Sequence, residues 1–448
     1  MPFLDSTERV SDLCGPVEQE LNRRHMGVRK QPGLPAARIE FLRKWPPRLR
    51  LLFVLTMAVC GGAGCQHFPP DFFPLGIYTA GNVSQLPILR QAGFNVVAGP
   101  AERSFLNAAQ AAGLKVLASP GTSAGPQFNA AVVRSAIRQF DAHPAVWGWH
   151  LVDEPDLNRI TPTDVVQAHR YFKSLRPRKP TALVIYAGYN ALDYGHITDV
   201  LLLDRYPIPW LPLADFGQQV ALARLALGKQ KPLFAILQAF DWSYHPALVP
   251  GEKNLRPPTY TELRCMTYCA LAQQANGLFY YTFDDGKWKI TEHPETWNAV
   301  QNVVKEVHDR LPLFQAQHLW WPLRRRFEDR TRRFNQALGS SVTSVCLRVR
   351  KGNASVPPGE YVLCVNNTDW PHVYSFELPH PMEGDLPVLG EQRRVSLEHN
   401  WLKDKFTPYA VHVYGPLLPR HPQQPTGASS GADNGHKRKS SVALVGGP

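Results

Sequence analysis

Short β-rich runs alternate with helical segments eight times between Phe72 and Leu311, and this alternation restricts the fold more than any other feature of the sequence. In such a pattern each helix carries the chain back to the start of the sheet, so that successive strands run parallel. Eight such units within about 240 residues match the size of a closed (β/α)8 barrel. We therefore predict an α/β protein built on a TIM barrel.

The predicted strands are apolar runs without helical spacing, separated by segments with helix signals such as Thr161-Pro162. Strands are predicted over 75–79, 94–99, 114–119, within 143–156, and over 182–187, 199–207, 232–240 and 277–285. Helices are predicted over 84–92, 104–112, 126–142, 162–175, 214–227, 259–276 and 294–311. Beyond residue 320, short β-rich runs alternate with Pro, Gly and Asn turns, which predicts a small antiparallel β-sandwich.

Composition divides the chain into four parts. We predict a basic segment with a signal peptide over 1–68, the barrel over 69–315, the β-sandwich over 316–418 and a disordered tail over 419–448. The formal net charge is +12, but seven basic residues lie between Met26 and Arg50, ahead of the barrel. Basic and aromatic residues are not interleaved as in nucleic-acid-binding motifs, so we expect no nucleic-acid partner.

An apolar run of ten residues, Leu51–Cys60, follows a basic stretch and precedes GGAGCQ. It is too short to span a bilayer and has the form of a secretory signal. The sequence up to Cys65 resembles the lipobox of bacterial lipoproteins, which implies lipidation of Cys65, although Gly62 stands where Leu is usual. We expect an exported protein of the cell envelope that is anchored to the membrane, with a secreted or periplasmic protein as the alternative.

Cofactor and metal motifs are missing from the sequence. It contains no Gly-rich phosphate loop, HExxH pair or CxxC cluster, so we predict no cofactor and no metal. Cys265 and Cys269 are four residues apart on a predicted helix without further ligands, which favours buried helix residues. Cys346 and Cys364 can pair in an oxidising compartment if they lie close enough.

The stretch His143–Asp156, HPAVWGWHLVDEPD, delivers Asp153 and Glu154 to the end of the fourth predicted strand, where Pro155 stops it. The carboxyl ends of barrel strands hold the active sites of TIM-barrel enzymes. Side chains alternate between the two faces of a strand. We expect the small, polar face to line the barrel interior and the bulky face to pack outward. The first face comprises Gly148, His150, Val152 and Glu154, and the second comprises Trp147, Trp149 and Leu151.

Glycosidic bonds are usually broken by two carboxyl groups that flank the anomeric carbon. Carboxylates end three of the predicted strands, and aromatic side chains suited to stacking on sugar rings stand at or just beyond strand ends. The carboxylates are Asp153, Glu154, Asp204, Asp284 and Asp285. The aromatic residues are Tyr78, Tyr186, Tyr206 and Trp242, of which Trp242 lies on a long loop where we expect it to be exposed.

Each of these residues also has a structural interpretation. Glu154 can pair with a barrel Arg or Lys, and Asp204, before Tyr-Pro, can cap a loop. Asp284-Asp285-Gly286 has the composition of a turn, and His150 in mid-strand is typical of a buried, hydrogen-bonded histidine.

The barrel with WHLVDEP on its fourth strand resembles the clan A glycoside hydrolases, a superfamily of retaining β-glycosidases, and especially its bacterial branches. The resemblance covers roughly residues 72–311. It implies that Glu154 is the general acid/base and that Asp153, where the clan usually has Asn, accepts a hydrogen bond from the sugar 2-hydroxyl. The clan's nucleophile is a Glu at the end of strand seven, where this chain has Gln238.

Because Gln238 cannot form a glycosyl ester, three possibilities remain. Asp204 or Asp285, and less plausibly Asp241, acts as nucleophile or as base for an inverting water. Alternatively, the substrate supplies its own nucleophile, such as an acetamido group that Gln238 positions. In the third case the barrel binds sugar without hydrolysing it.

The predicted function is a glycoside hydrolase acting on an extracytoplasmic oligosaccharide or polysaccharide. Glu154 and Asp204 are the predicted catalytic residues. The predicted substrate-binding residues are Asp153, Tyr78, Tyr186, Tyr206, Gln238, Trp242 and Asp285. The alternative is a non-catalytic carbohydrate-binding or envelope protein on the same scaffold. A metal-dependent barrel hydrolase would need His and Asp ligands at the strand ends, and the histidines are not placed for one.

Overall fold

The computed structural model describes residues 72–79, 81–319, 323, 325–326, 342–380, 382 and 384–417. The predicted signal segment with Cys65 and the predicted tail over 419–448 lie outside the described residues.

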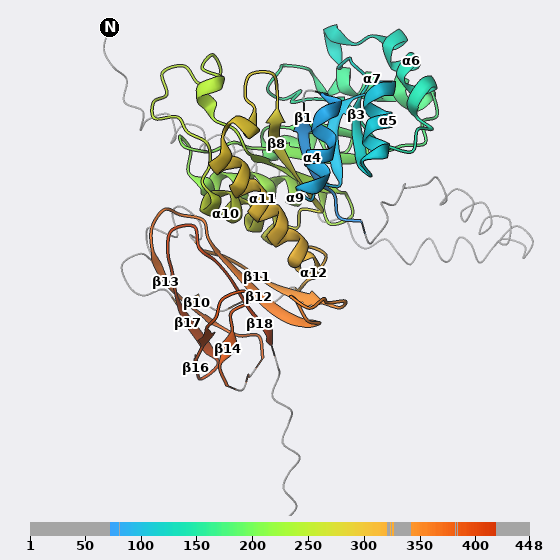
Figure 1. Cartoon of the computed structure of the whole chain (residues 1–448). Helices are drawn as coiled ribbons and strands as arrows, with labels where there is room; N and C mark the ends of the chain where they lie inside the picture. Colours follow the sequence, from blue (N-terminus) through green and yellow to red (C-terminus); the bar gives the residue numbers. More distant parts are fainter. Residues whose placement is uncertain are drawn as a thin grey trace, which may run out of the picture. The chain divides into compact units, whose positions relative to one another are not determined.

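Eight parallel strands form a closed barrel, paired in chain order, with β8 returning to pair with β1 (Figure 1). The barrel predicted from the eightfold alternation is therefore confirmed. Each predicted run overlaps one strand, although β2 and β5 extend one residue beyond the predicted bounds. The strands are β1 (Leu75–Thr79), β2 (Val96–Pro100), β3 (Lys115–Ser119), β4 (Val146–Val152), β5 (Thr181–Ile185), β6 (Val200–Asp204), β7 (Leu233–Gln238) and β8 (Gly277–Asp284).

Helices alternate with these strands, and local capping explains where several begin. Thr161 and Asp164 form a reciprocal capping box at the start of α7. Asn129 caps α6, so that this helix begins later than predicted. The helices are α4 (Leu86–Gln91), α5 (Arg103–Ala111), α6 (Ala130–Phe140), α7 (Pro162–Ser174), α8 (Ala191–Tyr194), α9 (Leu213–Leu227), α10 (Tyr260–Ala272), α11 (Pro294–Asp309) and α12 (Leu311–Phe314).

The barrel interior is filled by alternate residues of successive strands. On β6 these are Val200 and Leu202, and the next residue in the same row is Asp204. Phe234 of β7 stacks on Phe279 of β8, with ring centroids 6.1 Å apart. This packed apolar interior supports the polar side chains that follow at the carboxyl ends of the strands.

Strand β4 departs from strict alternation at two irregularities in its pairing, one beside Trp147 and one beside Leu151. His150 faces inward and Trp149 outward, as predicted. The assignment was wrong for Trp147, which stacks on Phe234 inside the barrel, and for Val152, which packs in the outer core that includes the helices. Each irregularity adds a residue to one strand and so reverses the alternation beyond it.

Antiparallel sheets follow the barrel, as predicted. One sheet has the order β18-β12-β11-β9, a second has the order β10-β13-β17-β16, and a buried core joins them. The strands are β9 (Gln317–Leu319), β10 (Arg325–Arg326), β11 (Val342–Val349), β12 (Gly359–Asn366), β13 (His372–Glu377), β14 (Leu386–Pro387), β15 (Arg394–Val395), β16 (Leu397–Glu398), β17 (Trp401–Phe406) and β18 (Val411–Leu417).

The four described cysteines are buried and form no disulfide bond. Cys346 lies opposite Val362 and Cys364 opposite Ser344 in the β11/β12 ladder. The pairing of Cys346 with Cys364 that an oxidising compartment would permit is therefore not formed.

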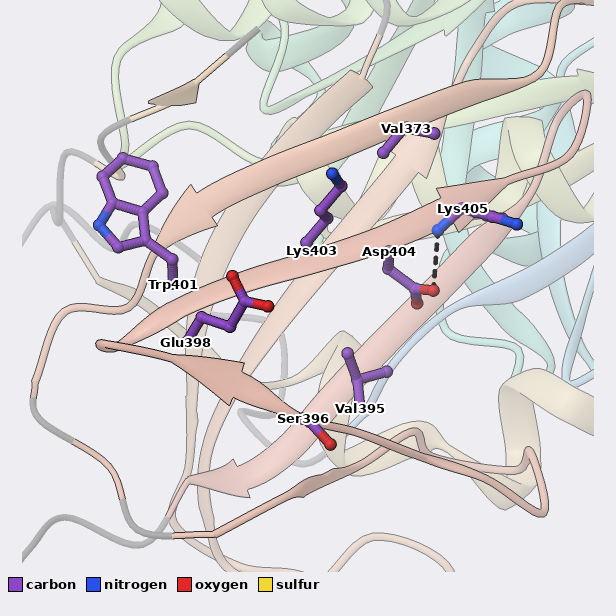
Figure 2. Close-up of a pocket in the computed structure, with 8 residues that line it drawn as sticks. All are labelled: Val373, Val395, Ser396, Glu398, Trp401, Lys403, Asp404 and Lys405. Carbon is purple, nitrogen blue, oxygen red and sulfur yellow. Dashed lines mark hydrogen bonds between the residues drawn. The ribbon is translucent and has the colours of Figure 1, made fainter. Parts of the chain in front are cut away.

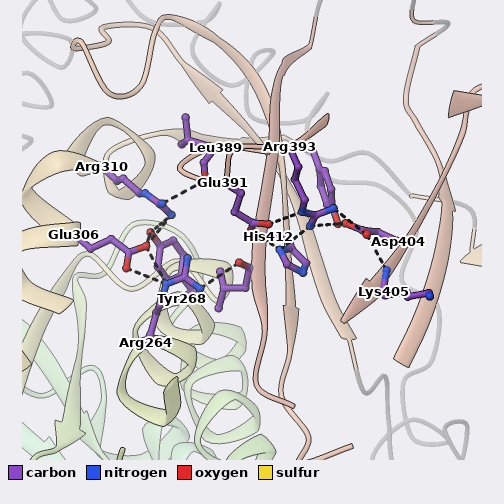
Figure 3. Close-up of polar contacts among 12 residues, drawn as sticks. Arg264, Tyr268, Glu306, Arg310, Leu389, Glu391, Arg393, Asp404, Lys405 and His412 are labelled. Atoms are coloured by element: carbon purple, nitrogen blue, oxygen red, sulfur yellow. Dashed lines mark hydrogen bonds and ion pairs between the residues drawn. The ribbon is translucent and has the colours of Figure 1, made fainter. Parts of the chain in front are cut away.

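The first of these sheets packs against the barrel helices, since Leu347 and Val413 belong to the same apolar core as the barrel. Polar contacts surround this core (Figure 3). Glu306 of α11 accepts hydrogen bonds from Arg264 at 2.9 Å and from Tyr268 at 2.9 Å, and it forms an ion pair with Arg310 at 2.7 Å. The two arginines also donate to sheet carbonyls, Arg264 to Val411 and Arg310 to Leu389.

A hollow of about 560 Å³ lies on the second sheet, over β17 and β16 (Figure 2). Trp401, Lys403 and Glu398 are among its lining residues. None of its lining residues belongs to the barrel, so it is separate from the strand ends described next.

Candidate active site at the strand ends

The site begins with the backbone of Glu154, the second residue after β4. Its N–H donates to the carbonyl of Val184 at 3.1 Å, and its carbonyl accepts from Leu157 and Asn158. The φ angle of Glu154 is +41°, a left-handed conformation that non-glycine residues seldom adopt. The carboxyl group is therefore held in place by a backbone that is anchored on both sides.

Glu154 and Asp204 form a side-chain hydrogen bond with each other. Burial raises the pKa of Asp204 well above its usual value, and the charge of Glu154 raises it further. Burial also raises the pKa of Glu154, to which the charges of Asp153 and Asp156 contribute. Because two adjacent carboxylates repel each other in a buried site, the pair retains a proton at a pH where isolated carboxyl groups have lost theirs.

Three tyrosines surround the pair. Tyr281 of β8 stacks on Tyr206 with centroids 5.6 Å apart, and Tyr78 of β1 lies 5.7 Å from Tyr281. Tyr206 also forms a hydrogen bond with Asp204. Burial raises the pKa of Tyr78 and of Tyr206 well above the ordinary value. Their hydroxyl groups are therefore neutral hydrogen-bonding groups at physiological pH.

Asp285 forms a second polar group beside Tyr281. Tyr281 donates its hydroxyl hydrogen to Oδ2 of Asp285 at 3.2 Å, and Nε2 of His245 lies 3.1 Å from the same oxygen. The backbone N–H groups of Lys287 and Trp288 donate to the other oxygen. Burial alone would raise the pKa of Asp285, but the interaction with His245 and these backbone hydrogen bonds lower it to about 2. Asp285 is thus a stable carboxylate that orients the Tyr281 hydroxyl.

Gln238 ends β7, where the clan A resemblance places the nucleophile. Its amide nitrogen donates to the carbonyl groups of Ile208 at 2.7 Å and Phe240 at 3.1 Å, and its amide oxygen accepts from the N–H of Ile208 at 2.9 Å. Both amide hydrogens are therefore used by the backbone, and Gln238 fixes the loop that follows β6.

Trp242 differs from the expectation of an exposed stacking surface. Only 9% of the residue is exposed, and its ring packs 4.8 Å from Phe240. Its indole N–H donates to the carbonyl of Tyr206 at 3.2 Å. The prediction of an exposed ring was wrong because the loop after β7 folds back over the strand ends.

Tyr186 follows β5, and the guanidinium of Arg205 lies 4.3 Å from the centre of its ring. Asp153 remains 64% exposed in its side chain, with Nε2 of His150 at 3.4 Å. Asp284 accepts hydrogen bonds from Gln85 and from the N–H of Gly286, consistent with the predicted turn.

Two residues of this site were not singled out from the sequence, Tyr281 and His245. A signal for Tyr281 was present, since alternation along β8 from the interior residue Phe279 brings Tyr281 to the same face. For His245 there was no such signal, because its position depends on how the loop after β7 folds.

Among the described residues, no group of three or more His, Cys, Asp or Glu side chains is placed to hold a metal ion. No helix in that part of the chain is both long and apolar enough to cross a bilayer.

Replacing Asp204 by Asn is expected to stabilise the protein at neutral pH. The pKa of Asp204 is raised on folding, so its contribution to stability is greatest below the unfolded pKa and is lost as pH rises through the folded pKa. Asn stays neutral and avoids this loss. Thermal unfolding at pH 7 should show a higher Tm for the variant, by about 2–4 °C for each kcal/mol gained in the free energy of unfolding. Below a pH of about 4 the Tm of the variant should not exceed that of the wild type. A variant with a lower Tm at pH 7 would contradict this.

No protein-family model matches this sequence, and no curated protein matches it significantly. Solved structures do match its fold. A glycoside hydrolase family 5 protein from Bacteroides vulgatus is 12% identical with a TM-score of 0.51, covering 77% of this chain and 88% of its own. A catalytic mutant of a GH42 β-galactosidase from G. stearothermophilus is 9% identical with a TM-score of 0.50, covering 77% and 98%. An α-amylase from Geobacillus thermoleovorans, solved with acarbose, is 10% identical with a TM-score of 0.46, covering 78% and 99%.

The barrel is thus distantly similar in structure to barrel glycoside hydrolases. At these identities the similarity concerns the fold alone.

Proposed function

We propose that this chain is a glycoside hydrolase in which Glu154 is the general acid that protonates the leaving oxygen. The observation that carries the proposal is the hydrogen-bonded pair of Glu154 and Asp204 among tyrosines at the carboxyl end of the barrel. Glycoside hydrolysis requires a carboxyl group that is still protonated near neutral pH. Burial and neighbouring negative charge raise the pKa of Glu154 in that direction.

The structural interpretation of Glu154 needs a cationic partner. Among the described residues no Arg, Lys or His forms an ion pair with Glu154, whereas Glu306, whose side chain is 13% exposed, has two arginine partners. An acid whose purpose is stability would be expected to have such a partner, because an unpaired buried charge is costly. The position of Glu154 therefore supports a chemical role.

The direct test is sugar release from a panel of aryl glycosides that covers common hexoses, 2-acetamido hexoses and both anomers. Saturable hydrolysis of one series would support the proposal, and no release from any member of the panel would count against it. The second candidate is a carbohydrate-binding protein without activity, which Gln238 at the end of β7 favours. Calorimetric binding of an oligosaccharide that is not cleaved would support that candidate.

We also propose that the protein is exported and lipid-anchored through Cys65, on the basis of the sequence from Leu51 to Cys65. Amino-terminal analysis of the mature protein tests this. A mature chain that still carries Leu51 would exclude cleavage before Cys65.

A further inference from the structure

Most other carboxylates near the strand ends already have partners. Asp156 accepts the N–H groups of Tyr186 and Ala187 and the side chain of Asn190, and Asp215 pairs with Arg205. Asp241 accepts the N–H of Ser243 at 2.7 Å. Asp284 and Asp285 hold the turn after β8, as described above. Asp153 is largely exposed, so Glu154 and Asp204 are the carboxyl groups near the strand ends that are bonded to each other rather than to the turn and loop backbone.

Glu154 and Asp204 share a side-chain hydrogen bond, which places both carboxyl groups on the same side of a bound sugar. Two carboxyl groups that flank an anomeric carbon stand about 5–5.5 Å apart in retaining enzymes and about 6.5–9.5 Å apart in inverting enzymes. Hydrogen-bonded carboxyl oxygens are only about 2.5–3.0 Å apart. Glu154 and Asp204 therefore act as one unit on one side of the bond, and the nucleophile has to come from elsewhere. The side chain of Gln238 cannot bind the substrate through its amide hydrogens, because both already donate to backbone carbonyl groups.

Among the described residues, the buried polar atoms without a hydrogen-bond partner include Oδ1 of Asp204 and the hydroxyl of Tyr78, both at the strand ends. Leaving such atoms unsatisfied costs about 1–3 kcal/mol each, so a bound ligand that satisfies them gains affinity. Asp204 offers an acceptor and the neutral Tyr78 hydroxyl offers a donor. A secondary amide matches both, because its N–H can donate to Asp204 and its carbonyl can accept from Tyr78.

We infer that the substrate is a 2-acetamido-2-deoxy-hexoside and that its own acetamido carbonyl oxygen is the nucleophile, with Asp204 and Tyr78 binding the amide. This inference rests on the proposed glycoside hydrolase function and specifies its substrate class. The 2-acetamido group reaches the anomeric carbon from the face opposite the leaving group when the two are trans. In the gluco and galacto series, the substrate is therefore the β anomer.

The reaction balances with water as the only other reactant. The carbonyl oxygen forms a bond to the anomeric carbon while the glycosidic bond breaks, and the leaving oxygen takes the proton held by Glu154. The sugar becomes a cyclic oxazolinium ion, whose positive N–H faces the carboxylate of Asp204. Water then adds to the anomeric carbon and gives a proton to Glu154, and the ring opens to restore the acetamido group. The anomeric configuration is retained.

The test compares 4-nitrophenyl N-acetyl-β-glucosaminide and N-acetyl-β-galactosaminide with the matching β-glucoside and β-galactoside. An intramolecular nucleophile is worth many orders of magnitude, so we expect kcat/KM to be at least about 100-fold higher for an acetamido sugar. Replacing the acetyl hydrogens by one, two and three fluorines should lower kcat stepwise, because fluorine withdraws electrons from the carbonyl oxygen.

The possible outcomes separate this inference from the proposed function. Equal cleavage of the acetamido and hydroxyl sugars, or a kcat independent of fluorination, would overturn the inference and leave the hydrolase function standing. Failure to cleave either series would overturn both the inference and the hydrolase function.

Tyr78→Phe should reduce kcat/KM for the acetamido sugar about 10-fold, which corresponds to loss of one hydrogen bond. Tyr189→Phe, at a tyrosine that is 60% exposed, is the matched control and should have no effect.

Discussion

Replacing Glu154 by Gln is expected to lower kcat for an unactivated alkyl or sugar leaving group by about 10²–10⁴-fold, the usual contribution of a general acid. KM should change little, because Gln has nearly the same shape. The loss should be smaller for a 2,4-dinitrophenyl leaving group, which departs without protonation. Steady-state kinetics on a series of leaving groups with increasing pKa would measure this dependence.

The pH profile supplies a second readout for Glu154. Burial raises the pKa of Glu154, and the acid must be protonated to act, so wild-type activity should fall as pH rises through that raised pKa. This alkaline limb should be absent from the residual activity of Glu154→Gln. Glu252→Gln, in an exposed loop, is a matched control expected to behave as the wild type. Equal kcat in wild type and Glu154→Gln on the poorest leaving group would remove Glu154 from the mechanism.

Replacing Glu306 by Ala is expected to destabilise the protein by about 3–5 kcal/mol, the usual effect of removing one partner from a buried ion pair. Arg264 and Arg310 keep only 19% and 12% of their side chains exposed, and without Glu306 both lose their anionic partner (Figure 3). Urea unfolding at pH 7 should show a lower midpoint.

The control for Glu306 lies on the same helix. Asp309 pairs with Lys305 at the surface, with side chains 49% and 73% exposed, and removal of such a pair costs at most about 1 kcal/mol. Asp309→Asn should therefore unfold close to the wild type. If Glu306→Ala unfolds at the same urea concentration as Asp309→Asn, the ion pairs of Glu306 with Arg264 and Arg310 contribute little to stability.

Barrel helices and the first sheet share one apolar core, so we expect a single unfolding transition for both.

The barrel could be predicted because each parallel strand is buried on both faces and therefore consists of a continuous run of apolar residues. This is clear for β6 and β7, in which every residue is buried. The inward and outward faces of strand β4 could not be predicted in this way. Its interior residues could not be assigned by alternation, because the irregular pairing beside Trp147 and Leu151 depends on the neighbouring strands.

Part of the site could be predicted for a similar reason. Strand ends of a parallel barrel meet at one face, which indicated that the ends of β4 and β6 lie near each other. The direct contact between Glu154 and Asp204 could not be predicted, because it depends on the shear of the barrel and on the turn at Glu154. The burial of Trp242 and the approach of His245 to Asp285 depend on a long loop, whose path is not encoded in local sequence patterns.

The left-handed backbone at Glu154 also bears on how this position would change under random mutation. Glycine adopts such a conformation without cost, and asparagine adopts it more readily than glutamate does. Backbone stability alone would therefore favour replacement of Glu154. The cost of keeping its carboxyl group largely buried would favour the same replacement. In a barrel that evolved without selection for its carboxyl group, drift would be expected to erase the glutamate. A carboxyl-bearing residue held in this unfavourable conformation therefore supports the chemical role proposed for Glu154.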